Sequence, residues 1–229
     1  MKKIFLFFII LFSYFITNAQ KNQFDSNGKR DGIWIKRFKN GNIRYQGKFN
    51  HGKEVGLFKY FSLESTKNPI ILKKFNPNDD IASVRFFTTT GRILSRGKMK
   101  GKNRIGKWIY YHKDGKSTLQ EENYLNGKLD GKYTTYFINK KPTIETYYKN
   151  GLLNGSYKRY AIKGHVYQDL HYKNGVLNGK AIYYDRLNGD LIKKGHFLND
   201  IKTGLWEFYY KGEFIDSKDL TTKSRLKKK

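Results

Sequence analysis

Short runs of aromatic and β-branched residues alternate with glycine-bearing turns along most of the chain, as at Lys107 to Tyr111 and Ile144 to Tyr148. Dipeptides between such runs, including Asn40-Gly41 and Asp114-Gly115, favour the positive φ of tight hairpin turns. Two strands of roughly five to eight residues plus two turns fill about 24 residues, which leaves no space for a helix. The pattern therefore predicts an all-β fold: an elongated antiparallel meander of about eight repeated hairpins, without a helical domain.

One motif sets the length of each hairpin: Asn-Gly-x-x-x-Gly, followed two residues later by an aromatic residue. The second glycine and the residue two positions on recur as Gly32 and Trp34, Gly56 and Phe58, Gly106 and Trp108, Gly131 and Tyr133, Gly155 and Tyr157, Gly179 and Ala181, and Gly204 and Trp206. Successive second glycines are 24 or 25 residues apart, except for one interval of 50. Because 50 is two periods, we expect a degenerate copy within residues 76–100, where Pro77 and Asp79-Asp80 replace the glycines.

The recurring aromatic residues are interpreted as the scaffold, because a single hairpin has no core and must pack on its neighbours. A second aromatic position follows three residues later, as at Tyr111 and Tyr160. Residues three apart on a regular strand point to opposite faces. Either both faces carry aromatic residues, or a bulge near the glycine shifts the register. An exposed aromatic row that binds ligands is the alternative to a structural role.

The Asn-Gly-Lys-x-x-Gly-x-Trp/Tyr units resemble MORN repeats (membrane occupation and recognition nexus), and the resemblance covers residues 27–216. Tyr45-Gln46-Gly47-Lys48-Phe49 is the nearest match to the family's opening strand. The sequence is most similar to the divergent bacterial variants that are described as antitoxin-like. The resemblance implies an elongated sheet of hairpins that mediates protein or lipid contacts without catalysis. The resemblance also implies an antitoxin role, but the predicted export from the cytoplasm argues against this role.

The two ends of the chain depart from the repeat. Met1-Lys2-Lys3, an apolar stretch from Ile4 to Ile16 and the small Ala19 predict a signal peptide over residues 1–19, with Gln20 as the new N-terminus. Residues 20–26 then form a short leader, and residues 217–229 form a basic tail that ends in three lysines. We therefore expect a protein that is periplasmic, attached to the cell envelope or secreted.

No residue pattern indicates catalysis, a cofactor or a metal site. The chain has no cysteine, and its five histidines share no repeat position, although His165 and His171 flank one predicted strand. Asp79-Asp80 and Glu121-Glu122 are adjacent carboxylates, which on a strand point to opposite faces and cannot converge on one substrate atom. The first pair is expected in a loop and the second as solvated strand charge. We expect a protein that is not an enzyme.

The formal charge of +27 comes from 46 basic residues, of which 36 are lysines and 10 are arginines. Paired recognition of phosphates or bases relies on arginine, so nucleic acid is not the expected ligand. Lysine suits diffuse attraction to acidic lipid, lipopolysaccharide or another polyanion. Four lysines each follow a first glycine and are candidate polyanion-binding residues: Lys29, Lys53, Lys102 and Lys128. The alternative is that lysine keeps an open sheet soluble. An unidentified protein is the favoured partner, with an anionic surface as the second choice.

Overall fold

The computed structural model describes residues 20–64, 67–76 and 79–221, and every element in these ranges is a β-strand. The first nine strands are β1 (Gln23–Phe24), β2 (Arg30–Arg37), β3 (Ile43–Asn50), β4 (Lys53–Tyr60), β5 (Ile71–Phe75), β6 (Ile81–Phe87), β7 (Ile93–Lys100), β8 (Asn103–Tyr111) and β9 (Thr118–Leu125). The others are β10 (Lys128–Leu129), β11 (Gly131–Tyr136), β12 (Pro142–Lys149), β13 (Leu152–Tyr160), β14 (Val166–Lys173), β15 (Val176–Tyr184), β16 (Leu191–Leu198), β17 (Ile201–Tyr210) and β18 (Glu213–Asp219).

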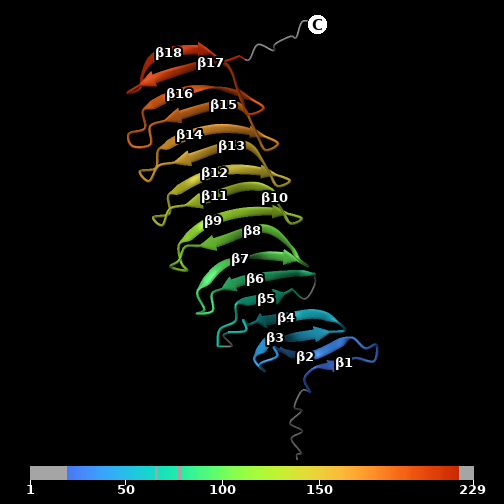
Figure 1. Cartoon of the computed structure of the whole chain (residues 1–229). Helices are drawn as coiled ribbons and strands as arrows, with labels where there is room; N and C mark the ends of the chain where they lie inside the picture. The colour runs from blue at the N-terminus through green and yellow to red at the C-terminus, as the bar shows by residue number, and fades with distance from the viewer. Residues whose placement is uncertain (1–19, 65–66, 77–78, 222–229) are drawn as a thin grey trace, which may run out of the picture.

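The strands form one long antiparallel meander. Each strand pairs with the next in the chain, except that β9 pairs both with the short β10 and with β11. Figure 1 shows the strands side by side in chain order, from β1 at one end to β18 at the other. The predicted all-β array of repeated hairpins is confirmed. The described ranges contain no helix long and apolar enough to span a membrane.

In most copies of the motif the first glycine and the residue before it form a two-residue turn, and the exceptions are Asn27 and Lys100, which lack positive φ. Asn150 and Gly151 have φ values of 50° and 87°, and Asn174 and Gly175 have 52° and 89°. Positive φ at both positions defines the turn that matches the twist of two antiparallel strands, which explains the Asn-Gly preference. At the other side of the sheet the loops are longer. In the loop that contains Asp114-Gly115 only the glycine has positive φ, so this dipeptide is not a two-residue turn.

The second glycine of the motif interrupts the pairing. Gly56 has φ 68°, and the register between β3 and β4 shifts between Gln46 and Lys48, opposite this glycine. The same shift recurs in the later hairpins, between Arg96 and Lys98 for example. Aromatic residues also lie on both faces, because Tyr157 packs on Tyr172 while Tyr160 bonds Glu145 on the opposite side. The sheet therefore has both features that could explain aromatic residues three positions apart: aromatic residues on both faces and a bulge near the second glycine.

One face of the sheet carries the core, in a line of side chains that we call the core column. It follows the strand partners through Trp34, Gly47, Phe58, Lys73, Val84, Gly97, Trp108, Glu122, Tyr133, Thr146, Tyr157, Leu170, Ala181, Gly195 and Trp206. Phe58, Trp108, Ala181 and Trp206 are fully buried. At about half of its steps, as at Gly47–Phe58, Gly97–Trp108 and Gly195–Trp206, the column puts a small residue beside a large one, so that single hairpins without a core of their own fill one another's gaps.

The degenerate copy keeps its place in the array. Val84 takes the position of the aromatic residue and is 1% exposed, and the buried Ala82 takes the position of the second glycine. β5 and β6 pair without a register shift, because an alanine does not supply the positive φ that the bulge requires.

The strands at the two ends differ from the predicted boundaries of the array. β1 lies within the predicted leader, and β18 continues to Asp219, three residues beyond the expected end at residue 216. Leu220 then donates its backbone N–H to Gly204 and packs on the core around Trp206. The predicted signal peptide and residues 222–229 of the predicted tail lie outside the described residues.

Candidate binding face

A second line of side chains runs along the opposite face, which we call the outer face. This outer column follows the strand partners through Ile35, Gln46, Lys59, Leu72, Arg85, Arg96, Ile109, Glu121, Thr134, Glu145, Lys158, Asp169, Ile182, Lys194 and Glu207. Each member directly follows or precedes a core-column residue, so its side chain points the other way.

From β8 onward the acids of the outer column have basic and tyrosine partners. Lys132 Nζ lies 2.7 Å from Glu145 Oε1, and the hydroxyl of Tyr160 donates to Oε2 of the same carboxylate over 2.6 Å. Hydrogen bonds from these two groups hold the pKa of Glu145 below its ordinary value of 4.5. Further pairs follow the same arrangement: Lys107 with Glu121, Lys158 with Asp169, and Lys194 with Glu207.

The strands β5 to β8 carry basic residues without acids, and Asp79 and Asp80 lie in the loop between β5 and β6. The strand sequences contain no aspartate or glutamate, and their lysines and arginines are Lys73, Lys74, Arg85, Arg96, Lys98, Lys100, Arg104 and Lys107. Arg85 and Arg96 are direct cross-strand partners in the outer column. Neither guanidinium forms an ion pair within the described ranges. Lys107 pairs with Glu121 and Arg104 lies 4.0 Å from Glu122, so the uncompensated positive charge shown on this half of the outer face is that of Arg85 and Arg96.

Two shallow grooves lie on the same half of the outer face. One, of about 530 Å³, is bordered by Arg85, Arg96 and Lys98, with Ile93 and Ile109 among its apolar walls. The other, of about 380 Å³, is lined by Ile33, Ile35, Gln46, Gly47, Lys48, Leu57 and Lys59. Ile33 and Leu57 are exposed. Apolar surface next to unpaired basic side chains is a combination that suits a partner with both apolar and acidic groups.

The four lysines that follow a first glycine are exposed at the hairpin turns, as the repeat predicts. Lys29 stacks on the neighbouring turn at Gly52, and Lys128 lies next to the turn at Gly151. The degenerate copy separates Lys53 from Lys102, so the residues form two pairs rather than one continuous row.

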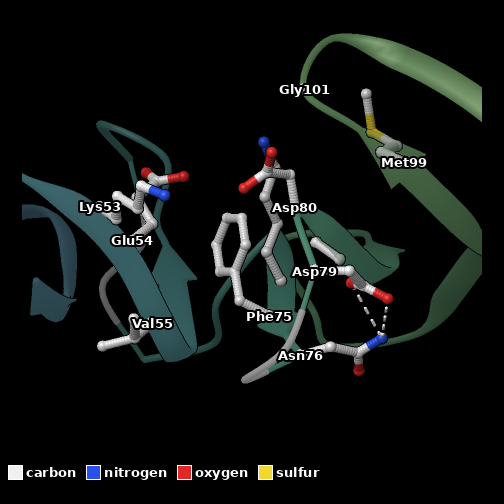
Figure 2. Close-up of a pocket in the computed structure, with 11 residues that line it drawn as sticks. Lys53, Glu54, Val55, Phe75, Asn76, Asp79, Asp80, Met99 and Gly101 are labelled. Carbon is white, nitrogen blue, oxygen red and sulfur yellow. Dashed lines mark hydrogen bonds between the residues drawn. The ribbon is translucent and has the colours of Figure 1, made fainter. Parts of the chain in front are cut away.

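A pocket of about 330 Å³ opens at the degenerate copy, and Lys53, Asp79 and Asp80 line it together (Figure 2). Asp79 accepts a hydrogen bond from the backbone N–H of Ile81 over 2.8 Å and further bonds from the Asn76 amide. The pair thus lies in a loop, as expected. The carboxylates beside Lys53 make this position less suited to a polyanion than the other three lysines.

Glu122 differs from its sequence interpretation. Glu121 and Glu122 point to opposite faces, as predicted, but Glu122 is 7% exposed and is not solvated strand charge. Its carboxylate accepts hydrogen bonds from the Tyr124 hydroxyl at 2.7 Å and from Gln120 at 2.6 Å, and Arg104 lies 4.0 Å away. Burial, reinforced by Glu122, raises the pKa of Tyr110. The repeat position of Glu122 holds glycine, threonine or leucine in five other hairpins and lysine in one, and this pattern was the signal for burial.

The histidines lie apart from one another. His51 contacts Asp25 at 2.8 Å, and His165 bonds the carbonyl of Arg186 at 3.0 Å. Within the described ranges, no group of three or more histidine, aspartate or glutamate side chains is arranged to hold a metal ion. His165 and His171 contact different glycines, Gly189 and Gly179, of the next hairpin.

Comparison with known proteins adds no identification. No protein-family model matches the chain, and no curated protein matches it either. The fold class therefore stands on the structure alone: a single open antiparallel sheet of repeated hairpins.

Proposed function

We propose that the protein is an exported, non-catalytic repeat scaffold that binds another protein through the outer face of strands β2–β8. The observation that carries this proposal is the contrast along the outer column. In the second half of the array the acids are matched by lysine and tyrosine, whereas in the first half apolar side chains and unpaired basic groups are exposed together. Such surface is what a complementary acidic and apolar partner would cover.

The finer family assignment belongs to this proposal. The Asn-Gly-Lys-x-x-Gly-x-Trp/Tyr unit, its two-residue Asn-Gly turn and its pitch of 24 or 25 residues support a MORN-like array. A MORN-like scaffold presents a long surface without a catalytic centre, which fits a role in assembling partners at the cell envelope or outside the cell.

Affinity capture from an envelope extract at moderate salt tests the proposal. We expect the purified chain to retain a protein in saturable, stoichiometric amounts. A variant with Lys59 and Arg85 changed to glutamate should lose it, and one with Lys163 and Lys173, which lie beyond the proposed face, changed to glutamate should retain it. Recovery of no saturable partner, or equal capture by both variants, would contradict the proposal.

The second candidate function is attachment to an anionic surface, favoured by the exposure of Lys29, Lys102 and Lys128 at one side of the sheet. Retention on anionic vesicles or on lipopolysaccharide should then fall steeply between about 50 and about 500 mM salt. A flat salt response would exclude this candidate.

Fractionation with N-terminal sequencing decides which partners are accessible. Export predicts a chain that begins at Gln20 and is recovered outside the cytoplasm. An antitoxin role, which depends on the family resemblance alone, requires the opposite result: an uncleaved chain in the cytoplasm.

A further inference from the structure

Arg85 and Arg96 are the one pair of like charges that are direct neighbours in the outer column. Cβ atoms of directly opposite residues in an antiparallel pair are about 4.5–5.5 Å apart, and like charges there destabilise the sheet. Both side chains are exposed. Within the described ranges neither guanidinium forms an ion pair, and the one ring contact of the pair is between Arg96 Cζ and the ring of Tyr111, at 5.9 Å. The sheet itself therefore gains nothing from this pair.

In the next three hairpins, the position equivalent to Arg96 carries an acid that forms an ion pair. Arg96 directly precedes Gly97, and the residues that directly precede the matching core-column positions in the next three hairpins are Glu121, Glu145 and Asp169. Each of those three acids lies within 4 Å of a lysine. Asp169 lies directly opposite Lys158, and an acid at position 96 would lie opposite Arg85 in the same way, whereas Arg96 leaves two cations side by side.

The surroundings of the pair indicate the class of ligand. Lys98 extends the positive charge along β7, and Ile93 and Ile109 provide apolar walls to the same groove. The guanidinium of an arginine binds a carboxylate through two parallel hydrogen bonds, and this chain already pairs its own outer-face lysines with carboxylates. A simple inorganic anion would leave the apolar walls uncovered, whereas an acidic peptide with apolar side chains would cover both.

We propose that Arg85 and Arg96 form a carboxylate-binding site for an acidic, partly apolar segment of a partner protein. The proposal rests on the proposed scaffold function and assigns it a specific pair of residues. The segment's carboxylates occupy the place that Glu121, Glu145 and Asp169 occupy within the chain's own outer column.

Fluorescence anisotropy with a labelled twelve-residue peptide, in which glutamates alternate with leucine and serine, tests the site. We expect Arg96→Glu to weaken binding at least about tenfold, because it removes a two-bond contact and adds a repelling charge. The same substitution should keep or raise the melting temperature, since the new carboxylate would pair with Arg85. Lys173→Glu, an exposed substitution on β14 with the same change in net charge, should change the affinity by less than about twofold.

The alternatives give different results. Equal weakening by Arg96→Glu and Lys173→Glu would show that only the overall charge attracts the peptide, and would overturn the proposal. Arg96-dependent binding of a sulfated polysaccharide or of phosphatidylglycerol vesicles, without binding of the peptide, would overturn it as well. If Arg96→Glu fails to fold, the double variant Arg85→Gln with Arg96→Gln relieves the repulsion and replaces it in the assay, with the same expected loss of peptide binding.

Affinity capture separates this proposal from the function on which it rests. Saturable capture of a protein by both the wild type and Arg96→Glu would reject the site and leave the scaffold function standing. Arg96-dependent peptide binding without capture of any saturable partner would support the site and reject the scaffold function.

Discussion

Gly97 lies flat against the indole of Trp108: a Cβ added at Gly97 would be 2.3 Å from Cδ2 of the ring. The indole N–H donates to the carbonyl of Lys98 over 3.1 Å, and the ring is fully buried. Gly195 and Trp206 repeat both the contact and the hydrogen bond near the end of the array, with distances of 2.3 Å and 3.2 Å. Gly47 and Phe58 repeat the contact alone. These glycines lack positive φ and are selected by the space that the aromatic ring needs.

Gly97→Ala should therefore destabilise the protein by overpacking rather than by backbone strain. Because the new methyl group meets a buried ring that has no free space to enter, we expect a loss of about 1–3 kcal/mol in the free energy of unfolding. Urea denaturation followed by tryptophan fluorescence measures it. Lys98→Ala, at the exposed neighbouring position, should stay within about 0.5 kcal/mol of the wild type. Equal stability of Gly97→Ala and the wild type would contradict the close approach.

Leu170 and Ala181 reverse this size order, with the large residue on the earlier strand and the small one on the later strand. Leu170→Gly should cost about 3 kcal/mol or more through the cavity it leaves, and Ala181→Phe should cost about 1–3 kcal/mol through overpacking. The double variant recreates the Gly47–Phe58 arrangement. It should be more stable than the sum of the single effects by about 1–3 kcal/mol in a double-mutant cycle. Strict additivity would show that the two positions do not share one space.

The hairpins were predictable because their signals are local. An Asn-Gly turn, a second glycine with positive φ and an aromatic residue two positions on lie within eight residues of one another, and their period counts the hairpins. The degenerate copy was also found by period alone, although its buried Val84 and Ala82 do not resemble the motif.

The pairing of small with large residues in the core column and the location of the binding face were not predictable, because both depend on the register between strands. A glycine inside a strand such as Gly97 gives no sign of the ring that covers it. The contrast between Arg96 and Glu121 emerges only when cross-strand partners are aligned, and each bulge moves that alignment. The exposed position of the lysines after the first glycines was predictable because they are tied to a turn, and their role in binding stays a prediction. The buried carboxylate of Glu122 was misjudged because composition describes it only as a charge.

Thr146 and Thr134 offer a comparison of two buried hydroxyl groups. Thr146 is 1% exposed, and among the described residues its Oγ1 is the one buried side-chain polar atom without a hydrogen-bond partner. Thr134 is 3% exposed, and its hydroxyl bonds Tyr136. Thr146→Val should raise the free energy of unfolding by about 1 kcal/mol, because it removes an unsatisfied polar atom. Thr134→Val should lower it by a similar amount. Chemical denaturation of both variants checks the signs, and a loss of stability in Thr146→Val would reveal a partner for its hydroxyl.

Glu145 should make stability depend on pH in the acidic range. Hydrogen bonds from Lys132 and Tyr160 lower its pKa in the folded chain below the ordinary 4.5, so the folded state holds the carboxylate more tightly in its charged form than the unfolded state does. The resulting stabilisation is fully present above about pH 4.5 and is lost as the pH falls through the lowered folded value.

Urea midpoints measured between about pH 7 and about pH 3 should therefore fall less steeply for Glu145→Gln than for the wild type, and the two should converge at the acidic end. Glu213→Gln, at an exposed residue of β18 without an ion pair in the described ranges, removes the same charge and should follow the wild-type slope. Both substitutions change the self-repulsion of this basic chain equally, so the difference between them isolates the contacts of Glu145 with Lys132 and Tyr160. Parallel curves for the two variants would show that these contacts contribute nothing to folding.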